Sequence, residues 1–322
     1  MNWRATNETN PGILVPGIVG PTAVGKTGIA VTIAEARGWE IVSADSRQVY
    51  KLLDIGTAKP TPAERSRVMH HLVDIVPPWE AYSCGTYRRQ ATAAMEGLLV
   101  VGKVPLVVGG SGLYLRALER GLFDGPERDE SIRSELRASA ERGGRDSLHE
   151  MLAKVDPVSA KRIHPRDTER VIRAIEVYRI TGKPISELQR DSSVPPRFKL
   201  FLVGLRRPRE SLYRLINERF DRMLEAGLLD EVRGLVAKGF SQQWPSFRTV
   251  GYRELAGHLR GEMSLDTARD KAKAETRRFA KRQLTWFSRA PVSEWVDVPE
   301  GEAAALTAER VSEVLRRAGL SL

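Results

Sequence analysis

Short apolar runs alternate with longer mixed segments along the first half of the chain. Four of these runs are candidates for buried strands: 12–19, 41–42, 72–76 and 105–108. The segments between them have a helix-like spacing of apolar positions, most clearly at 27–37 and 88–99. Strands separated by helices are typical of βαβ units, so the pattern predicts an α/β fold with a parallel sheet. A further apolar run at 198–204 predicts a fifth strand.

About 90 residues separate the fourth predicted strand from the fifth. Residues 129–190 show helical periodicity and little β signal, which predicts a small all-helical insertion. We therefore expect 1–124 to form the first part of a core, 125–196 the insertion, and 197–322 the rest of the core. Helices are also predicted in this last part, at 211–225, 228–238 and 264–289. After Pro299 the pattern predicts only a weakly specified surface helix.

Composition narrows the classes of protein to which the chain can belong. Its 322 residues are enough for about two domains. The single cysteine, Cys84, excludes an intramolecular disulfide, and the polar first ten residues predict no signal peptide. No apolar stretch approaches the length of a membrane helix, so we expect a cytoplasmic protein that does not contact membranes. The net charge of +10 favours an anionic partner, most often nucleic acid.

Residues 20–27 read GPTAVGKT and match the phosphate-binding pattern G-x-x-x-x-G-K-[ST]. They follow an apolar strand and precede a helical segment, which is the context that the pattern requires. The glycines allow the backbone to wrap round an anion, and the helix N-terminus adds partial positive charge. Lys26 can reach phosphate oxygens, and Thr27 Oγ1 can ligate Mg²⁺. The predicted phosphate-binding residues are Gly20, Pro21, Thr22, Ala23, Val24, Gly25, Lys26 and Thr27.

Two segments, 41–45 and 72–74, could supply a carboxylate beside this site. Asp45 is the better candidate because it ends the second predicted strand, and ligands of open α/β sheets bind at that edge. A carboxylate there can hold Mg²⁺ or act as a general base, although aspartate is also a common helix N-cap. The glycine-rich run 109–112, after the fourth predicted strand, should bring backbone close to the same ligand.

Several longer motifs resemble the bacterial tRNA dimethylallyltransferases, also called isopentenyl-tRNA transferases. The resemblance runs in order from Gly17 to Trp286, which is nearly the whole chain. The motifs are SADSRQVY (43–50), DIGTAKP (54–60), HHLVDI (70–75), YSCGTYRR (82–89), PLVVGGSGLYLRAL (105–118), IHPRDTERVIRAIEVY (163–178), RFDRMLEAGLLDEV (219–232), RTVGYRE (248–254) and TRRFAKRQLTWF (276–287). Of these, DIGTAKP, GYRE and AKRQLTWF are much more specific than the phosphate-binding pattern.

The resemblance implies a P-loop core with an inserted helical domain and a defined reaction. Enzymes of this family transfer a dimethylallyl group from dimethylallyl diphosphate to the exocyclic amine of the adenosine just 3′ of the anticodon, and diphosphate leaves. Their substrates are tRNAs that read codons beginning with U. The resemblance further implies Mg²⁺ as cofactor, the tRNA anticodon stem-loop as partner, a monomer, and no obligatory protein partner.

The resemblance also implies roles for individual residues. Lys26, Arg219 and Mg²⁺ on Thr27 would stabilise the negative charge that develops on diphosphate. On the acceptor side, Asp45 would remove a proton from the adenine amine as the new bond forms. Residues implied to lie around the adenine are Ser46, Arg47, Gln48 and Ser111, of which Ser111 stands where many relatives have threonine.

The segment 269–289 holds eight Lys or Arg against two acidic residues, and several of its basic positions are four apart. This spacing predicts basic ridges on a helix, which is also typical of an ordinary solvated amphipathic helix. The resemblance implies tRNA contacts here, in the insertion and at 248–253: Arg133, Glu169, Arg170, Arg173, Arg248, Gly251, Arg253, Arg278, Lys281, Arg282 and Gln283. Such contacts rely on phosphate charge and loop shape, so tRNA binding should weaken with salt.

Two other functions remain open. A small-molecule kinase of the P-loop type would use the same phosphate site, but it would need an adenine pocket and would leave the basic C-terminal helix without a purpose. A non-catalytic RNA-binding protein could retain a relic phosphate loop. The intact set of Lys26, Thr27 and Asp45 argues against that second alternative.

Overall fold

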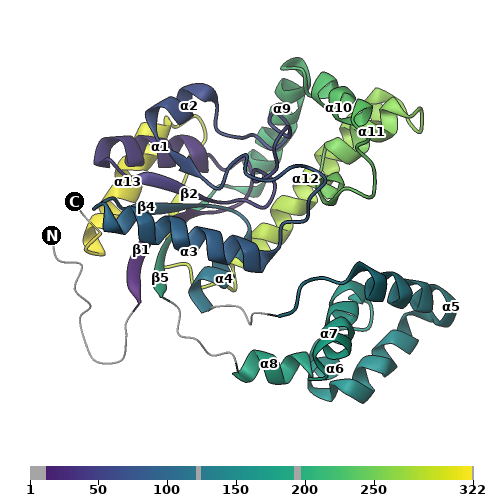
Figure 1. Ribbon diagram of the computed structural model, residues 1–322. Helices are drawn as coiled ribbons and strands as arrows, with labels where there is room; N and C mark the ends of the chain where they lie inside the picture. Colours follow the sequence, from purple (N-terminus) through teal and green to yellow (C-terminus); the bar gives the residue numbers. More distant parts are fainter. Residues whose placement is uncertain (1–11, 121–124, 192–196, 321–322) are drawn as a thin grey trace. The chain divides into compact units, whose positions relative to one another are not determined.

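A computed structural model describes residues 12–120, 125–191 and 197–320 (Figure 1). The chain divides into two compact units, which we call the core unit (Met1–Glu119 with Pro196–Leu322) and the insertion (Arg120–Pro195). The sequence predicts the insertion at 125–196, so the compact unit begins five residues earlier and ends one residue earlier. The connecting residues 121–124 and 192–196 lie outside the described ranges.

The core unit is built on a six-stranded parallel sheet with the order β3-β2-β4-β1-β5-β6 (Figure 1). The strands are β1 (Ile13–Val19), β2 (Glu40–Ala44), β3 (His70–His71), β4 (Pro105–Gly109), β5 (Phe198–Arg206) and β6 (Glu294–Asp297). Val19 pairs with Gly109 on one side and Gly204 on the other, so these strands end close together at one edge. The predicted α/β fold with a parallel sheet is confirmed, with one strand more than the five predicted.

Two strands differ from the sequence prediction. The run 72–76 is not a strand: it makes only an isolated bridge at Val76, and β3 lies directly before it. Leu72 and Asp74 have φ of 61° and 59°, which extended backbone does not allow. β6 escapes prediction because it is a four-residue edge strand with a single buried apolar side chain, Val296.

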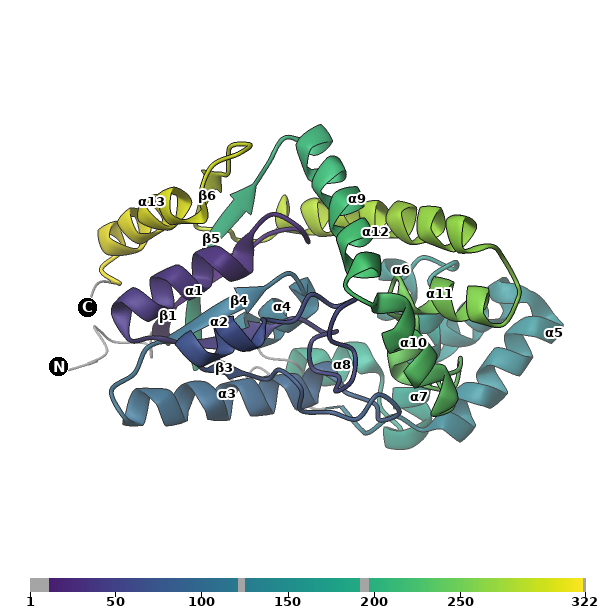
Figure 2. The ribbon, with the colours of Figure 1, turned by 90° about the horizontal axis from the view of Figure 1, so that it is seen from above.

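Helices cover both faces of the sheet (Figure 1, Figure 2). One face is covered by α1 (Lys26–Arg37) and α13 (Ala304–Arg317), and the other by α3 (Cys84–Val100) and α4 (Gly112–Arg120). Successive strand residues point to opposite faces, so Ile18 packs with α1 and α13 whereas Val19 packs with α3 and α4. Burial on both faces explains why the strands read as continuous apolar runs.

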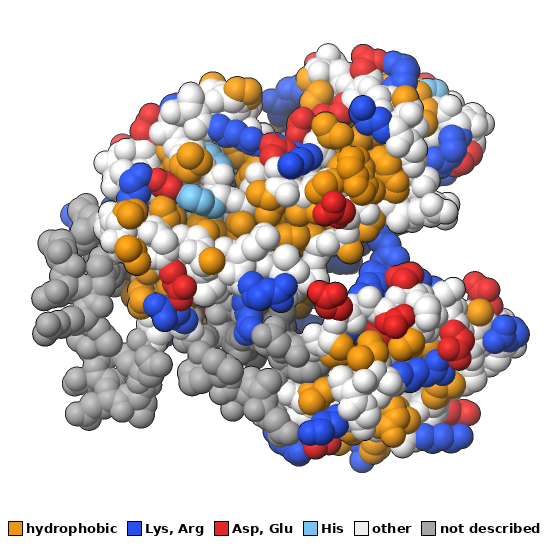
Figure 3. Space-filling model, in the orientation of Figure 1, with side chains coloured by type: hydrophobic (Ala, Val, Ile, Leu, Met, Phe, Trp, Pro, Cys, Tyr) orange, Lys and Arg blue, Asp and Glu red, His pale blue; other side chains and the backbone are white. Residues whose placement is uncertain are grey.

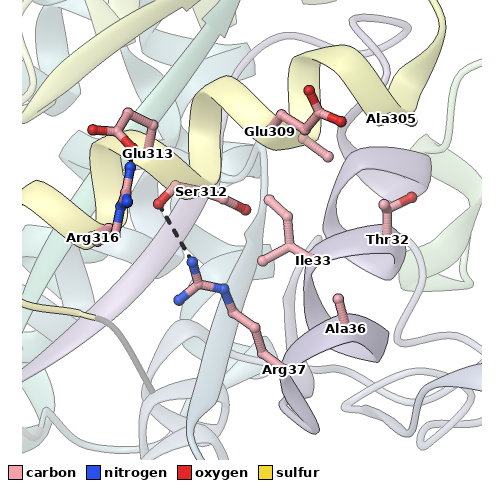
Figure 4. A pocket seen from close by; sticks show the side chains of 10 residues that line it. Thr32, Ile33, Ala36, Arg37, Ala305, Glu309, Ser312, Glu313 and Arg316 are labelled. Atoms are coloured by element: carbon pink, nitrogen blue, oxygen red, sulfur yellow. Dashed lines mark hydrogen bonds and ion pairs between the residues drawn. The ribbon is translucent and has the colours of Figure 1, made fainter.

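The terminal helix α13 belongs to the core, which corrects the prediction of a weakly specified surface helix. Val311 and Leu315 are fully buried in the cluster that contains α1. A cavity of about 320 Å³ lies between the two helices (Figure 4). Arg37 points into it and donates to Ser312 O at 3.4 Å. This cavity shares no residue with the phosphate-binding loop.

A second group of helices extends the core unit beside the sheet (Figure 2). Its members are α9 (Arg209–Glu225), α10 (Leu228–Ala237), the 3₁₀ helix η1 (Pro245–Arg248), α11 (Tyr252–Leu259) and α12 (Leu265–Phe287). The short α2 (Pro62–Arg67) lies beside α1 instead, and its Arg67 is ion-paired with Glu35. Phe220, Leu255 and Ala272 from α9, α11 and α12 pack with Leu53, from the loop after β2. Apolar side chains also reach the surface of the core unit (Figure 3). Trp79, between β3 and α3, is half exposed.

The insertion is entirely helical in its described residues, as predicted. Its helices are α5 (Glu130–Val155), α6 (Pro157–Arg162), α7 (Thr168–Thr181) and α8 (Ile185–Asp191). They enclose a separate apolar core that includes Leu136, Leu152 and Ile172. Gly144, with φ 78° and ψ 169°, interrupts α5 with a kink. None of the helices in the described ranges is long and apolar enough to cross a membrane.

Candidate active site

The phosphate-binding loop joins the end of β1 to the start of α1. Gly20 has φ 150°, and a Cβ on it would lie 2.7 Å from Leu205 O, so only glycine fits. Gly25, with φ 106°, caps α1, and no acidic residue occupies the first turn of that helix. The N-terminal end of α1 therefore offers an anion its partial positive charge without competition from a side-chain carboxylate of that turn.

Lys26, the first residue of α1, lies along this loop. Its Nζ donates to Gly20 O at 3.0 Å and to Pro21 O at 2.8 Å. Burial lowers the pKa of Lys26 to about 8; the Asp45 carboxylate opposes this shift and Arg219 adds to it. Because nearby negative charge favours protonation, a bound phosphate group would raise this pKa and stabilise the ammonium form.

Arg219, on α9, approaches the same loop from the other side. Its Nη2 donates to Thr22 Oγ1 at 2.8 Å. Burial lowers the pKa of its guanidinium, and the Asp45 carboxylate opposes that shift. Among the described residues, no carboxylate forms an ion pair with Lys26 or Arg219. Two partly buried cations thus share one loop without a neutralising partner, which is an arrangement suited to a multiply charged anion.

A cavity of about 260 Å³ opens at this loop. The residues that line it are Thr22, Ala23, Gly25, Lys26, Thr27, Gly28, Asp45, Gln48, Thr57, Ala58, Leu215, Arg219, Arg222 and Gln283. The structure therefore brings together the three predicted catalytic residues, Asp45, Lys26 and Arg219. Thr27, the predicted Mg²⁺ ligand, lines the same cavity.

Asp45 directly follows β2, and its carboxylate is held by a turn. Oδ1 accepts hydrogen bonds from Arg47 N at 2.8 Å and Gln48 N at 3.4 Å. The next residue in the turn, Ser46, donates its backbone N–H to Ser111 Oγ at 2.9 Å. A hydroxyl makes this contact, so Ser111 retains it without the methyl group of threonine. Ser111, which belongs to the glycine-rich run 109–112, thus stabilises the turn that holds Asp45.

Gln283, predicted as a tRNA contact, is buried on α12 and links two loops of the site. Its Oε1 accepts from Thr22 N at 2.8 Å, and its Nε2 donates to Gly110 O at 3.0 Å. A Cβ on Gly110 would lie 2.3 Å from that amide nitrogen, so the approach needs glycine. Each end of the amide makes one of these bonds, so one Oε1 lone pair and one Nε2 hydrogen remain for a further contact in the cavity.

Several residues around the cavity are absent from the sequence prediction. Thr57 and Ala58 line it from the DIGTAKP segment, whose backbone amides are held by Glu231 on α10 and Tyr252 on α11. Gln48 Nε2 donates to Ala58 O at 2.9 Å. The only signal for these residues in the sequence is their membership of the quoted motifs. Their contacts join positions far apart in the chain, which a local pattern does not reveal.

Most of the predicted tRNA contacts on the core unit are exposed: Arg248, Arg253, Arg278, Lys281 and Arg282. Arg253 is ion-paired with Glu254, and Arg278 with Glu275, within their own helices. Gly251 is buried, and its N–H donates to Glu254 Oε2 at 2.8 Å at the start of α11. Its part is to shape the segment 248–253 rather than to present a side chain.

Within the insertion, the predicted tRNA contact Arg133 is buried. This side chain is only 6% exposed; its Nη1 donates to Glu176 Oε2 at 3.1 Å, and its Nη2 is ion-paired with Glu169. Arg173 Nη1 also donates to Glu176, at 2.9 Å. Arg133 is therefore paired with the buried Glu176 and the half-exposed Glu169, and its side chain is not exposed for contact with RNA phosphates. Arg170, by contrast, is 75% exposed.

Comparison with known proteins gives consistent matches over nearly the whole chain. The family model described as IPP transferase matches residues 48–290, and one described as isopentenyl transferase matches 13–72. The chain is 48% identical over 286 residues to a tRNA dimethylallyltransferase of Thermotoga maritima, covering 89% of this chain and 90% of that protein. It is 49% identical over 272 residues to one of Syntrophobacter fumaroxidans, covering 84% and 80%.

Two solved structures resemble the fold. A full-length tRNA isopentenylpyrophosphate transferase from Bacillus halodurans is 38% identical, with a TM-score of 0.65, and the match covers 94% of this chain and 99% of that one. A eukaryotic dimethylallyltransferase, described in crystallographic snapshots of it acting on tRNA, is 27% identical, with a TM-score of 0.81. That match covers 95% of this chain and 79% of the other.

Proposed function

Because the chain belongs to the IPP transferase family, we propose that it is a tRNA dimethylallyltransferase that uses dimethylallyl diphosphate as donor. The observation that carries this proposal is the cavity itself. It lies at the N-terminus of α1 and is lined by two cations, Lys26 and Arg219, and by the carboxylate of Asp45. A diphosphate leaving group and an amine nucleophile need this pairing of charges.

On the donor side, the breaking C–O bond leaves its electron pair on diphosphate. Lys26, Arg219 and the amides of the phosphate-binding loop stabilise that charge as it develops, which is the interaction that accelerates the step. Arg219 bonded to Thr22 Oγ1 is already held beside the loop. Little reorganisation is therefore needed when diphosphate is released.

On the acceptor side, the exocyclic nitrogen of adenine attacks the allylic carbon and forms the new N–C bond. Its lone pair is delocalised into the ring, so removal of a proton during attack assists the reaction. Asp45 takes that proton, and the turn through Arg47 N and Gln48 N orients its carboxylate. Because a stacked adenine cannot reach the cavity, the base is flipped out of the anticodon loop.

A Mg²⁺ ion suits the oxygen donors that the cavity offers. Thr27 and Asp45 both line it, and Mg²⁺ commonly takes few protein ligands alongside phosphate oxygens and water. When bound, the ion would neutralise part of the diphosphate charge. We also infer a cytoplasmic location, because the substrate tRNA is found there.

The kinase and RNA-binding alternatives are disfavoured by the relatives, which are named as tRNA dimethylallyltransferases over most of the chain. The exposed basic residues of α12 are consistent with an RNA substrate and would have no use in a small-molecule kinase. The exposed arginine Arg170 of the insertion offers a further contact for RNA phosphates.

The test is an incubation of the protein with unmodified tRNA, Mg²⁺ and dimethylallyl diphosphate, followed by nucleoside digestion and mass spectrometry. We expect a gain of one dimethylallyl group on the adenosine just 3′ of the anticodon in tRNAs that read codons beginning with U. Transfer of phosphate from ATP to a metabolite, with no prenylated nucleoside, would favour the kinase instead. Binding of tRNA without modification at saturating donor would favour the RNA-binding protein.

A further inference from the structure

The acceptor side of the cavity is walled by a loop without regular secondary structure. Thr57 and Ala58 of this loop line the cavity, as does Gln48 next to Asp45. Gln48 Nε2 donates to Thr57 O at 3.3 Å and to Ala58 O at 2.9 Å. The position of residues 54–58 therefore determines where the Gln48 amide lies beside Asp45.

This loop is held from outside by the carboxylate of Glu231, on α10. Glu231 Oε2 accepts from Asp54 N at 3.1 Å and Ile55 N at 2.9 Å, and Oε1 accepts from Gly56 N at 3.5 Å. Three successive backbone amides that converge on one anion form a nest, and hydrogen bonds to a charged acceptor are stronger than neutral ones. The carboxylate thus fixes the loop through its main chain.

Tyr252, on α11, completes the attachment. Its Oη donates to Glu231 Oε1 at 2.5 Å and accepts from Gly56 N at 3.0 Å. A Cβ on Gly56 would lie 2.5 Å from the Tyr252 ring, so the loop and the ring are in close contact. Burial and the adjacent Glu231 carboxylate raise the pKa of Tyr252, which keeps the phenol protonated as a donor.

Tyr252 also belongs to the segment 248–253, whose Arg248 and Arg253 are exposed. We propose that Glu231 and Tyr252 are positioning residues. They couple the position of the segment 248–253 to that of residues 54–58, which in turn orient Gln48 beside the acceptor adenine. This inference rests on the proposed function, because it places an adenine beside Gln48. Neither residue lines the cavity, so both act through the loop.

A second set of contacts should keep residues 54–58 attached to the core unit when the contacts of Glu231 and Tyr252 are removed. The buried Lys59 Nζ donates to Tyr50 O at 2.6 Å and to Asp54 Oδ1 at 2.5 Å, and it is also ion-paired with Asp74. The base of the loop therefore stays attached when the Tyr252 hydroxyl is absent. Tyr252→Phe removes that hydroxyl and keeps the ring, and Glu231→Gln removes the charge and keeps the shape.

The first experiment measures transfer kinetics with tRNA and dimethylallyl diphosphate. We expect kcat to fall about tenfold in Tyr252→Phe and in Glu231→Gln, because displacing a positioned group weakens the reactive arrangement more than binding. The KM for the donor should stay within about twofold, since the phosphate-binding loop is not touched. The matched control is Tyr213→Phe, which alters a tyrosine on α9 that packs under Arg209.

The second experiment measures hydrogen exchange of backbone amides. We expect the amides of residues 54–56 to exchange faster in both variants, and those of β1 and α1 to be unchanged. Unchanged exchange at 54–56, or faster exchange with an unchanged kcat, would overturn the positioning role. A uniform rise in exchange across β1 and α1 would show general destabilisation and would also overturn it. An inactive wild type would instead overturn the proposed function on which the inference rests.

Discussion

Arg219 in the core unit is partly buried and Arg133 in the insertion is buried, and their partners differ. Arg219 donates to a neutral hydroxyl, Thr22 Oγ1, and stands beside Lys26 without an ion pair among the described residues. Arg133 lies between Glu169 and Glu176. The sequence predicts both arginines as ligand contacts, and only the side chains around them distinguish their roles.

The difference shows where the protein leaves charge uncompensated. In the insertion, acidic and basic side chains are interspersed on the surface (Figure 3), and the fully buried Glu176 is met by two arginines, Arg133 and Arg173. In the core cavity, burial without a partner lowers the pKa of Lys26 and of Arg219, so the folded apoprotein keeps two cations in a costly state. An anionic ligand would offset this cost, so we propose that the core cavity binds an anion and that the Arg133 cluster is structural.

The largest expected effect comes from the carboxylate in the cation-lined cavity. Asp45→Asn should lower kcat by about 10²–10⁴, because the variant keeps the turn but loses the proton acceptor. tRNA affinity should be unchanged, and single-turnover kinetics with a filter-binding measurement would check both. Near-normal turnover in this variant would remove the general-base role.

Arg219→Met tests the unpaired arginine directly. It should lower kcat by about 10²–10³, since one preorganised donor to the leaving group is lost. The fold should be retained, because the residue makes no ion pair in the described chain that the change would break. Circular dichroism and steady-state kinetics on the same sample would check this, and a change in stability without a change in kcat would contradict it.

Arg133→Met tests the paired arginine with the same substitution. It leaves Glu176 buried with less compensation, so the free energy of unfolding of the insertion should fall by about 3–5 kcal/mol. Hydrogen exchange of the α5 and α7 amides would measure the loss. Weaker tRNA binding with unchanged exchange would instead return Arg133 to the RNA contacts.

The pH dependence of donor use should report Lys26. Its folded-state pKa of about 8 means that the ammonium form, which attracts phosphate, is lost as pH rises through that value. The KM for dimethylallyl diphosphate should therefore rise above pH 8, by up to about tenfold per pH unit. Lys26→Arg, which stays charged, should show a flat profile. Parallel profiles for both proteins would assign the titration to another group.

The smallest effect is expected on the exposed helix surface. Arg282→Ala should weaken tRNA binding a few-fold and reduce the slope of log affinity against log salt by about one, because one phosphate contact is lost. The measurement is tRNA binding at several salt concentrations. An unchanged slope would place Arg282 outside the RNA interface.

The features that can be predicted from the sequence are local. The phosphate-binding loop is a contiguous pattern between a strand and a helix, and the apolar runs identify four of the six strands. The run 72–76 is misleading because its apolar content matches a strand, whereas Leu72 and Asp74 have positive φ. The apolar pattern of a run does not reveal such backbone angles.

The roles that sequence patterns miss depend on distant partners. Gln283 reaches Thr22 across 261 positions, and Tyr252 reaches Gly56 across 196. A basic or amide residue in a predicted contact segment has the same sequence signature whether it faces RNA, a carboxylate or a loop. Only the structure distinguishes the brace at Gln283 and the ion pairs of Arg133 from exposed residues such as Arg282.

The most direct test of the contrast between the two units is product inhibition by inorganic pyrophosphate. Its inhibition constant against dimethylallyl diphosphate would be measured for wild type, Arg219→Met and Arg137→Met, the last an ion-paired arginine of the insertion. We expect at least a tenfold weaker inhibition for Arg219→Met and an unchanged constant for Arg137→Met. Equal constants for all three proteins would contradict the claim that the unpaired cations of the core cavity hold diphosphate.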